Sequence, residues 1–198
     1  TENEVNYYKE KYLFVCGSTH PGEEEILIDS FIDLNKENKH LVLAPRHPER
    51  FGEIKELVNK KNLSNILYTE ISSNPNIKSD VTIVDVIGRL LDFYEIADCV
   101  FIGGTLVDHG GQNFLEPAFF NKPIISGRST YNFDEISKKL SDLGLLKFVS
   151  NKDEISSVVE NIEAISDSLK KDTNLWLNEN RGASKFISKK VCKEFNLI

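Results

Sequence analysis

The sequence predicts an α/β fold: a Rossmann-like, doubly wound parallel sheet with helices on both faces. Short, continuously apolar runs alternate along the chain with segments of helical periodicity, which is typical of buried parallel strands joined by crossover helices. Turns rich in glycine and polar residues follow several of these runs, where a sheet of this kind binds its ligands. A chain of 198 residues is long enough to bury such a core.

The first half of the chain begins with a strand–helix–strand unit. The apolar runs 12–16 and 40–44 are predicted strands, and apolar residues at helical spacing over 26–34 predict the helix between them. Three consecutive glutamates precede this periodic stretch, where the positive end of the helix dipole favours them. A helix over 49–60, a strand over 65–69, a polar loop over 71–80 and a short strand over 82–84 follow.

The second half continues the alternation and then changes character. We expect a helix over 90–97, a strand over 99–102, a helix over 113–120, a strand over 123–125 and a helix over 133–140. The last fifty residues predict two helices, 153–170 and 174–195, with no further strand. We therefore expect a ligand-binding domain over 1–170 and a C-terminal helix over 171–198 that packs on it or towards another domain. The basic residues of that end form either a solvated helix face or a surface for a second domain or an anionic membrane.

Composition excludes several classes of function. The net charge of −7 lacks the footprint of a nucleic-acid-coating protein, so no nucleic-acid partner is expected. No apolar run approaches the roughly 20 residues of a membrane-spanning helix, and no signal peptide is visible. Cys16, Cys99 and Cys192 form no C-x-x-C pair, and the histidines lack metal-site spacing, so neither disulfides nor a metal are expected. The start at Thr1 and the absence of methionine indicate a processed chain or an excised domain.

Two polar turns follow the first two predicted strands. The turn over 17–22 reads GSTHPG, and its Ser18, Thr19 and His20 would hold an anion at a helix N-terminus; the alternative is that Ser18 or Thr19 merely caps the helix. In the second turn, Pro45 and Pro48 restrict the backbone around Arg46 and His47, which favours presentation of a guanidinium to a phosphate or carboxylate. A solvated surface turn is the alternative there.

The densest cluster spans 103–118 and reads GGTLVDHGGQNFLEPA. Its four glycines, Gly104, Gly110 and Gly111 among them, allow close approach of the backbone to a ligand, and the last pair precedes a predicted helix whose amides would face a phosphate. Glu116 lies at the start of that helix, where a carboxylate can accept hydrogen bonds from two ribose hydroxyls. The competing interpretation of the spacing from Asn113 to Glu116 is a capping box.

Two further turns are less specific. Residues 85–88, which end in Ile87 and Gly88, would offer backbone groups to a nucleobase or form a plain turn. Asn132 precedes the helix predicted over 133–140 and would either cap it or reach the ligand.

With these elements in place, the pattern resembles the C-terminal domain of the Kdo transferases, which attach 3-deoxy-D-manno-octulosonic acid (Kdo) to lipid A precursor. The matching segments read STHPGEEE, APRHPERF, DVIGRLLDFYEIADCVFIGGTLVDHGGQNFLEPA and NKPIISGRSTYNF, with a weaker NRGASK near the end. They cover most of residues 13–185, in an order and spacing that a chance match would not reproduce.

The resemblance implies the C-terminal half of a GT-B glycosyltransferase, an enzyme with two Rossmann-like domains. This half would bind the donor CMP-Kdo, and the N-terminal half would bind the lipid A precursor and supply the glutamate base. The reaction would be inverting and independent of metal or cofactor, and this chain alone would contain no catalytic residue, bind cytidine nucleotide weakly and transfer no sugar. The whole enzyme would lie on the cytoplasmic side of the bacterial inner membrane, with membrane association only in the full-length protein.

By the same resemblance, the donor-binding residues are those of the turns already described: Ser18, Thr19, His20, Pro45, Arg46, His47, Ile87, Gly88, Gly104, Gly110, Gly111, Gln112, Asn113, Glu116 and Asn132. Arg46 would contact the nucleotide, Gly110, Gly111 and Asn113 its phosphate, and Glu116 the ribose. Two positions depart from the family pattern, because Gln112 replaces a histidine and Arg89 an acidic residue. A sugar-nucleotide epimerase of similar architecture and a non-catalytic nucleotide-binding module are the alternatives.

Overall fold

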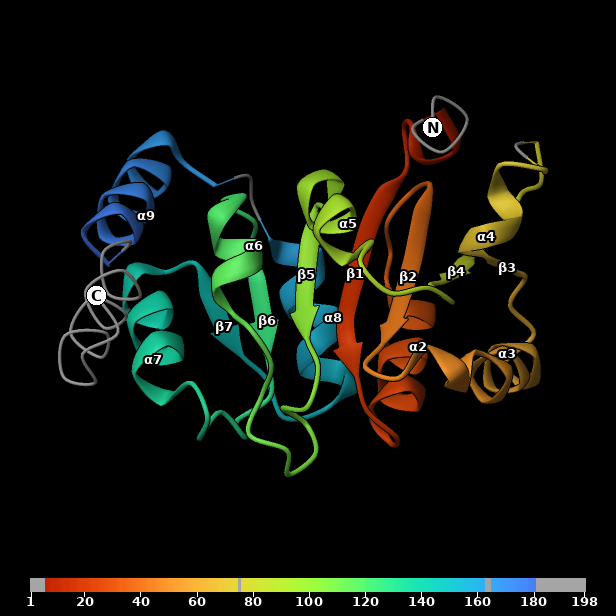
Figure 1. Cartoon of the computed structure of the whole chain (residues 1–198), viewed down its shortest axis with the longest axis horizontal. Helices are drawn as coiled ribbons and strands as arrows, with labels where there is room; N and C mark the ends of the chain where they lie inside the picture. Colours follow the sequence, from red (N-terminus) through yellow and green to blue (C-terminus); the bar gives the residue numbers. More distant parts are fainter. Residues whose placement is uncertain (1–5, 75, 163–164, 181–198) are drawn as a thin grey trace, which may run out of the picture.

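The computed structural model describes residues 6–74, 76–162 and 165–180, and within them the predicted α/β architecture is confirmed (Figure 1). The strands form one parallel sheet in the order β3-β4-β2-β1-β5-β6-β7. They are β1 (Tyr12–Thr19), β2 (Lys39–Pro45), β3 (Asn65–Leu67), β4 (Val81–Ile83), β5 (Cys99–Ile102), β6 (Ile124–Ser126) and β7 (Leu146–Phe148).

The strand order reverses at β1, in the middle of the sheet. The chain first builds outward from β1 through β2, and then returns to place β5 against the other side of β1. The loops that follow β1 and β5 therefore leave the sheet towards opposite faces. Such a switch point is where open α/β sheets bind ligands.

Helices cover both faces of the sheet, because alternate side chains of each strand point to opposite faces. In β1, Leu13 and Val15 join one core cluster, whereas Phe14 and Cys16 join the other. The second cluster is covered by α2 (Glu23–Asp33), α3 (Phe51–Lys60) and α8 (Lys152–Asn161). The first is covered by α4 (Tyr68–Ile71), α5 (Leu90–Ile96), α6 (Leu115–Phe119), α7 (Asp134–Leu143) and α9 (Asp167–Asn180). A short 3₁₀ helix, η1 (Pro48–Arg50), leads into α3.

The structure differs from the sequence-based expectation mainly at the edges. Strand β7 was not expected: it is three residues long, and its central Lys147 is exposed, so it lacks the continuous apolar run of a buried strand. At the other edge, the strand expected over 65–69 ends at Leu67, and α4 begins at Tyr68. Short, half-exposed edge strands carry little hydrophobic signal, which is why the pattern failed there.

The C-terminal helices also have different bounds. The helix expected over 153–170 ends at Asn161, and α9 begins at Asp167 and packs against α6 and α7. The rest of the helix predicted to reach residue 195, the NRGASK segment beyond Asn180 and Cys192 lie outside the described residues. The division at residue 170 stays a prediction.

The described part of the chain bears on three compositional expectations. Cys16 and Cys99 are buried free thiols, and burial raises the pKa of each. No helix within the described ranges is long and apolar enough to cross a membrane. Those ranges also contain no group of three or more histidine, cysteine or acidic side chains arranged to hold a metal ion.

Candidate functional site

A pocket of about 400 Å³ opens at the carboxyl ends of β1 and β2, beside α5, α6 and the loop after β5. Its lining consists of Ser18, Arg46, Gly88, Leu90, Leu91, Tyr94, Gln112, Asn113 and Glu116. A narrower slot of about 170 Å³ shares four of these residues and continues towards β4, lined in addition by Ala44, Pro45, Pro48, Val84, Val86 and Ile87. We refer to the two together as the switch-point cleft. The structure thus brings together residues predicted from four separate turns.

The turn after β1 divides its polar residues between the cleft and the core. Ser18 adopts a left-handed conformation with φ of 54°, where the register of β1 against β2 shifts, and it lines the cleft. Thr19 is instead fully buried, and its hydroxyl donates to Glu24 Oε1 at 3.0 Å. The Thr19 hydroxyl is therefore not available to hold an anion, contrary to the expectation from the sequence. Capping of α2 by Ser18 or Thr19 is wrong as well, because Gly22 occupies the N-cap position.

Glu23 fastens this turn to the loop after β5. Its buried carboxylate accepts four backbone amide hydrogen bonds: from His20 at 2.9 Å, Gly104 at 2.7 Å, Thr105 at 2.9 Å and Leu106 at 3.0 Å. A carboxylate with several amide donors is well compensated for the loss of water. Glu23 therefore fixes the position of one wall of the cleft against the other.

Arg46 is the cation that the cleft presents. It follows β2 and is exposed, and its guanidinium makes no hydrogen bond or ion pair with any residue that the structure describes. Arg50, by contrast, is neutralised by the buried Glu24, with Nη1 to Oε1 at 2.9 Å. His47 does not line the cleft; it is exposed, with Nδ1 3.5 Å from Glu49 Oε1. Arg46 is therefore available to an anionic ligand.

His20 lies behind the cleft in a stack of side chains. Its ring stacks on that of His109, with centroids 4.3 Å apart, and its Nε2 lies 3.2 Å from the amide nitrogen of Gln112, which reaches into the cleft. Desolvation lowers the pKa of His20, and the nearby imidazole and guanidinium groups lower it further. A neutral ring accepts the Gln112 amide hydrogen bond, so His20 and Gln112 orient each other.

The glycine loop after β5 differs from the expectation that Gly110 and Gly111 present free amides. The Gly110 amide donates to Ser129 Oγ at 3.2 Å, and the Gly111 amide donates to the Gly104 carbonyl oxygen at 2.9 Å. The Gly104 amide is itself bound by Glu23. These glycines instead allow the tight turns with positive φ that bring the next residues to the cleft. The amides of Gln112 and Asn113 donate to no residue that the structure describes, and both residues line the cleft, so these two amides are the loop's available donors.

Asn113 and Glu116 face the cleft and bond each other. Asn113 Nδ2 donates to Glu116 Oε1 at 3.0 Å, and Asn113 Oδ1 accepts from the Leu115 amide at 3.0 Å. The reciprocal backbone bonds of a capping box are not formed, so that interpretation is wrong. No described residue bonds the second oxygen of Glu116, which leaves it open to a ligand hydroxyl.

Asn132 holds the loop after β5 in place through two hydrogen bonds. Its Nδ2 donates to the His109 carbonyl oxygen at 3.0 Å, and its amide donates to the Gly110 carbonyl oxygen at 3.1 Å. It neither caps α7, whose N-cap is Phe133, nor lines the cleft. Direct contact of Asn132 with a ligand stays a prediction.

Sequence reasoning missed the lining residues of α5, which are Leu90, Leu91 and Tyr94. It also missed the role of Glu23, which does not line the cleft but holds the loops around it. Tyr94 is part of an apolar helical pattern, and the sequence offers no signal that one end of its side chain meets the cleft. Glu23 was read only as a charge near the helix dipole. Ile87, which was predicted, is 86% exposed and forms an apolar rim of the slot.

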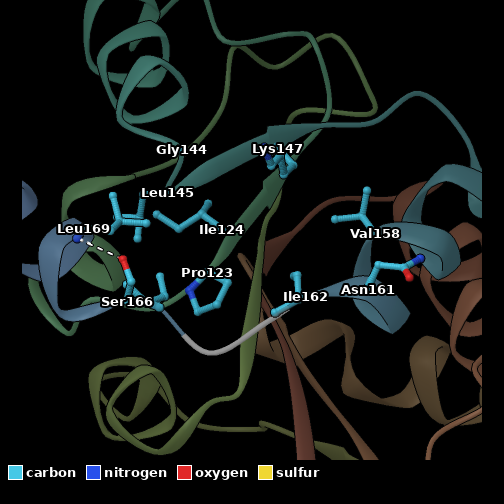
Figure 2. Close-up of a pocket in the computed structure, with 11 residues that line it drawn as sticks. Pro123, Ile124, Gly144, Leu145, Lys147, Val158, Asn161, Ile162, Ser166 and Leu169 are labelled. Carbon is cyan, nitrogen blue, oxygen red and sulfur yellow. Dashed lines mark hydrogen bonds between the residues drawn. The ribbon is translucent and has the colours of Figure 1, made fainter.

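A second pocket, of about 430 Å³, lies at the opposite edge of the sheet, near the amino ends of β6 and β7 (Figure 2). Figure 2 shows a lining of mostly apolar side chains around Pro123, Ile124 and Leu145, with Lys147 as the charged residue among those described. None of its described lining residues offers a carboxylate to accept hydrogen bonds from sugar hydroxyls. The switch-point cleft, which has Arg46 and Glu116, is therefore the better candidate for a nucleotide site.

Comparison with known proteins supports this choice. No family model matches the chain. Over 190 residues it is 36% identical to a bifunctional glycosyltransferase/methyltransferase of Fusobacterium nucleatum, covering 96% of the chain and 29% of that protein. It is also 36% identical over 181 residues to a 3-deoxy-D-manno-octulosonic acid transferase of Haemophilus influenzae, covering 88% of the chain and 42% of that enzyme. The chain thus spans less than half the length of these curated relatives.

Solved structures agree in fold. The C-terminal CMP-Kdo binding domain of WaaA from Acinetobacter baumannii superposes with a TM-score of 0.70 at 25% identity, covering 79% of this chain and 82% of that one. An O-GlcNAc transferase from Thermobaculum terrenum, at 13% identity and a TM-score of 0.55, shares the fold alone. Over most of its length the chain is therefore similar to Kdo transferases, and its fold is similar to that of a C-terminal CMP-Kdo binding domain.

Proposed function

We propose that this chain is the donor-binding domain of a glycosyltransferase that transfers Kdo from CMP-Kdo to lipid A precursor in lipopolysaccharide biosynthesis. The observation that carries the proposal is that Arg46 and Glu116 line the same cleft. An unpaired guanidinium suits a phosphate, and a carboxylate with a free oxygen suits a ribose hydroxyl. The homology to a CMP-Kdo binding domain supports the same assignment.

We assign each part of the donor to one part of the cleft. The apolar slot between Val84 and Leu90 would take the base, next to the backbone of Gly88. The phosphate would lie between Arg46 and the amides of Gln112 and Asn113, and the ribose would lie against Glu116. The Kdo would then extend past Ser18 towards His20 and Gln112.

Departure of CMP develops negative charge on its phosphate, and Arg46 together with the loop amides would stabilise that charge. We place the glutamate base and the acceptor site in an N-terminal region, because the match covers only 42% of the Haemophilus enzyme. The same proposal has three further parts. The transfer inverts the stereochemistry of the donor, and this chain alone does not carry it out. The whole enzyme lies at the inner face of the bacterial inner membrane.

Titration of the chain with CMP, CDP and UDP, followed by calorimetry or chemical shifts, tests the proposal. We expect weak, saturable binding of CMP, with perturbations at Arg46, Gly88 and Glu116. A preference for UDP would instead favour an epimerase-like domain, and sugar transfer to lipid A precursor by the chain alone would contradict the absence of a base from it.

A further inference from the structure

Tyr94 reaches the switch-point cleft from inside the core. Its side chain is only 1% exposed and belongs to the core cluster beneath β1 and β5, yet it is part of the cleft lining. The phenol oxygen lies at the carboxyl end of β1, where a Cβ added to Gly17 would be 2.0 Å from it, and the next residue, Ser18, lines the same cleft. The hydroxyl is therefore the end of Tyr94 that meets the cleft.

This hydroxyl has no hydrogen-bond partner among the residues that the structure describes. Other tyrosines of the core do have one: the Tyr7 hydroxyl lies 2.6 Å from Ser79 Oγ, and the Tyr8 hydroxyl donates to Thr82 Oγ1 at 3.2 Å. The Tyr94 hydroxyl is not among the fully buried side-chain atoms that lack a partner, so it is reached from the cleft and can meet a ligand there. An unpartnered hydroxyl that faces a cleft points to a ligand.

Glu116 determines which ligand group fits there. Burial raises the pKa of Tyr94 well above its ordinary value, and the nearby Glu116 carboxylate raises it further, so the phenol remains a neutral donor. One oxygen of Glu116 is bonded by Asn113, and the other is open. A neutral donor and an open carboxylate oxygen that line the same cleft are together complementary to a hydroxyl, which can accept from the first and donate to the second. A phosphate there would be repelled by Glu116.

We propose that Tyr94 and Glu116 recognise one and the same ribose hydroxyl of the bound nucleotide, which accepts a hydrogen bond from the Tyr94 phenol and donates one to Glu116. This inference rests on the proposed function, because it takes the ligand to be a ribonucleotide. It adds a binding residue from the core to a site otherwise built from loops. It also makes the cleft selective against a sugar that lacks the bonded hydroxyl.

Binding of three nucleotides to the Tyr94→Phe variant tests the inference: CMP, 2′-deoxy-CMP and 3′-deoxy-CMP, each titrated calorimetrically against the parent chain and the variant. We expect CMP affinity to fall about three- to tenfold, which is the typical effect of losing one neutral hydrogen bond. The analogue that lacks the bonded hydroxyl should bind both proteins equally, and the other analogue should lose as much affinity as CMP does.

Tyr8→Phe is the matched control, because it removes a buried phenol oxygen, and neither Tyr8 nor its partner Thr82 is among the residues that line the cleft. It should lower the melting temperature and leave all three affinities unchanged. Ligand-free Tyr94→Phe should melt at or above the temperature of the parent chain, because it loses only an unpartnered hydroxyl. A marked fall in its melting temperature would mean that the hydroxyl has a partner within the protein, and would overturn the inference.

The remaining outcomes separate this inference from the proposed function. If the parent chain binds CMP and Tyr94→Phe binds it equally well, the inference fails alone. An equal loss for all three nucleotides also overturns it, because the contact would then involve another part of the ligand. If the parent chain binds no CMP at all, the proposed function fails and the inference fails with it.

Discussion

The phenol oxygen of Tyr94 occupies the space that a side chain on Gly17 would need: the two positions are 2.0 Å apart. Gly17 therefore has no side chain for a packing reason, since its backbone is not in the left-handed region. The carboxyl end of β1 packs against α5 in this way because a glycine at position 17 leaves room for the Tyr94 side chain. This packing also fixes where the Tyr94 hydroxyl meets the switch-point cleft.

Gly17→Ala should consequently destabilise the chain and weaken nucleotide binding together. The added methyl must displace the Tyr94 ring within a packed core, which typically costs about 1–3 kcal/mol of unfolding free energy. Urea unfolding and CMP titration measure the two effects. Gly52→Ala is the control: it lies in α3 with open space around its Cβ position, so neither quantity should fall. Unchanged stability of Gly17→Ala would show that the ring moves aside freely.

Arg46→Ala should weaken CMP binding strongly with little change in stability. The guanidinium is exposed and makes no internal hydrogen bond within the described residues, so its loss removes a ligand contact only. A hydrogen bond to a charged group contributes about 1.5–3 kcal/mol, which corresponds to roughly a ten- to 150-fold loss of affinity.

Arg128→Ala makes the same change in net charge at an exposed arginine outside the cleft lining, and it should bind CMP as the parent chain does. Equal affinities for Arg46→Ala and Arg128→Ala would remove Arg46 from the site.

Glu23→Ala should be among the most destabilising substitutions near the cleft. It leaves four backbone amides without their acceptor, and even partial hydration of these groups leaves a loss of about 2–4 kcal/mol. Glu23→Gln, which retains one of the two acceptor oxygens, should lose less. Chemical denaturation gives both values.

Glu25→Gln is the control for Glu23, because Glu25 is on the same turn of α2 but is exposed and, among the described residues, forms an ion pair with Lys61. Surface ion pairs contribute at most about 1 kcal/mol. A Glu23→Ala variant as stable as Glu25→Gln would contradict the fastening of the two loops by Glu23.

His40 should make the chain less stable as the pH falls below about 6.5. Burial, and next the charge of Lys11, lower its pKa to about 3, while the Ser79 carbonyl and Asp80 act in the opposite direction. The Ser79 carbonyl oxygen lies 3.0 Å from Nδ1 and can only accept, so the neutral ring carries its proton there and accepts from Thr82 at Nε2. In the unfolded chain the ring protonates near its ordinary pKa.

Protons therefore bind the unfolded state preferentially between pH 6.5 and 3, and the stabilising contribution of the neutral buried ring is lost across this window, at up to about 1.4 kcal/mol per pH unit. The difference in unfolding free energy between the parent chain and His40→Gln, measured from pH 7.5 to 5, isolates this contribution. It should shrink as the pH falls; a constant difference would argue against a depressed pKa.

The sequence by itself determined the fold class and most of the polar residues of the cleft. Apolar runs such as those of β1 and β5 are buried on both faces, so their pattern is continuous and specific. The turns after them carry Ser18, Arg46, Asn113 and Glu116, whose side chains have a chemical reason to be there. The edge strand β7 was missed because a half-exposed strand of three residues has no such pattern.

Only the tertiary structure decided which polar groups are available to a ligand. Thr19 and the amides of Gly104, Gly110 and Gly111 are all used within the protein, because partners far away in the sequence, or on a neighbouring turn, satisfy them. Tyr94 is the opposite case: its pattern in the sequence is that of a core residue, yet its hydroxyl meets the cleft and has no hydrogen-bond partner among the described residues. Hydrogen-bond satisfaction depends on contacts between distant segments, and local sequence cannot encode it.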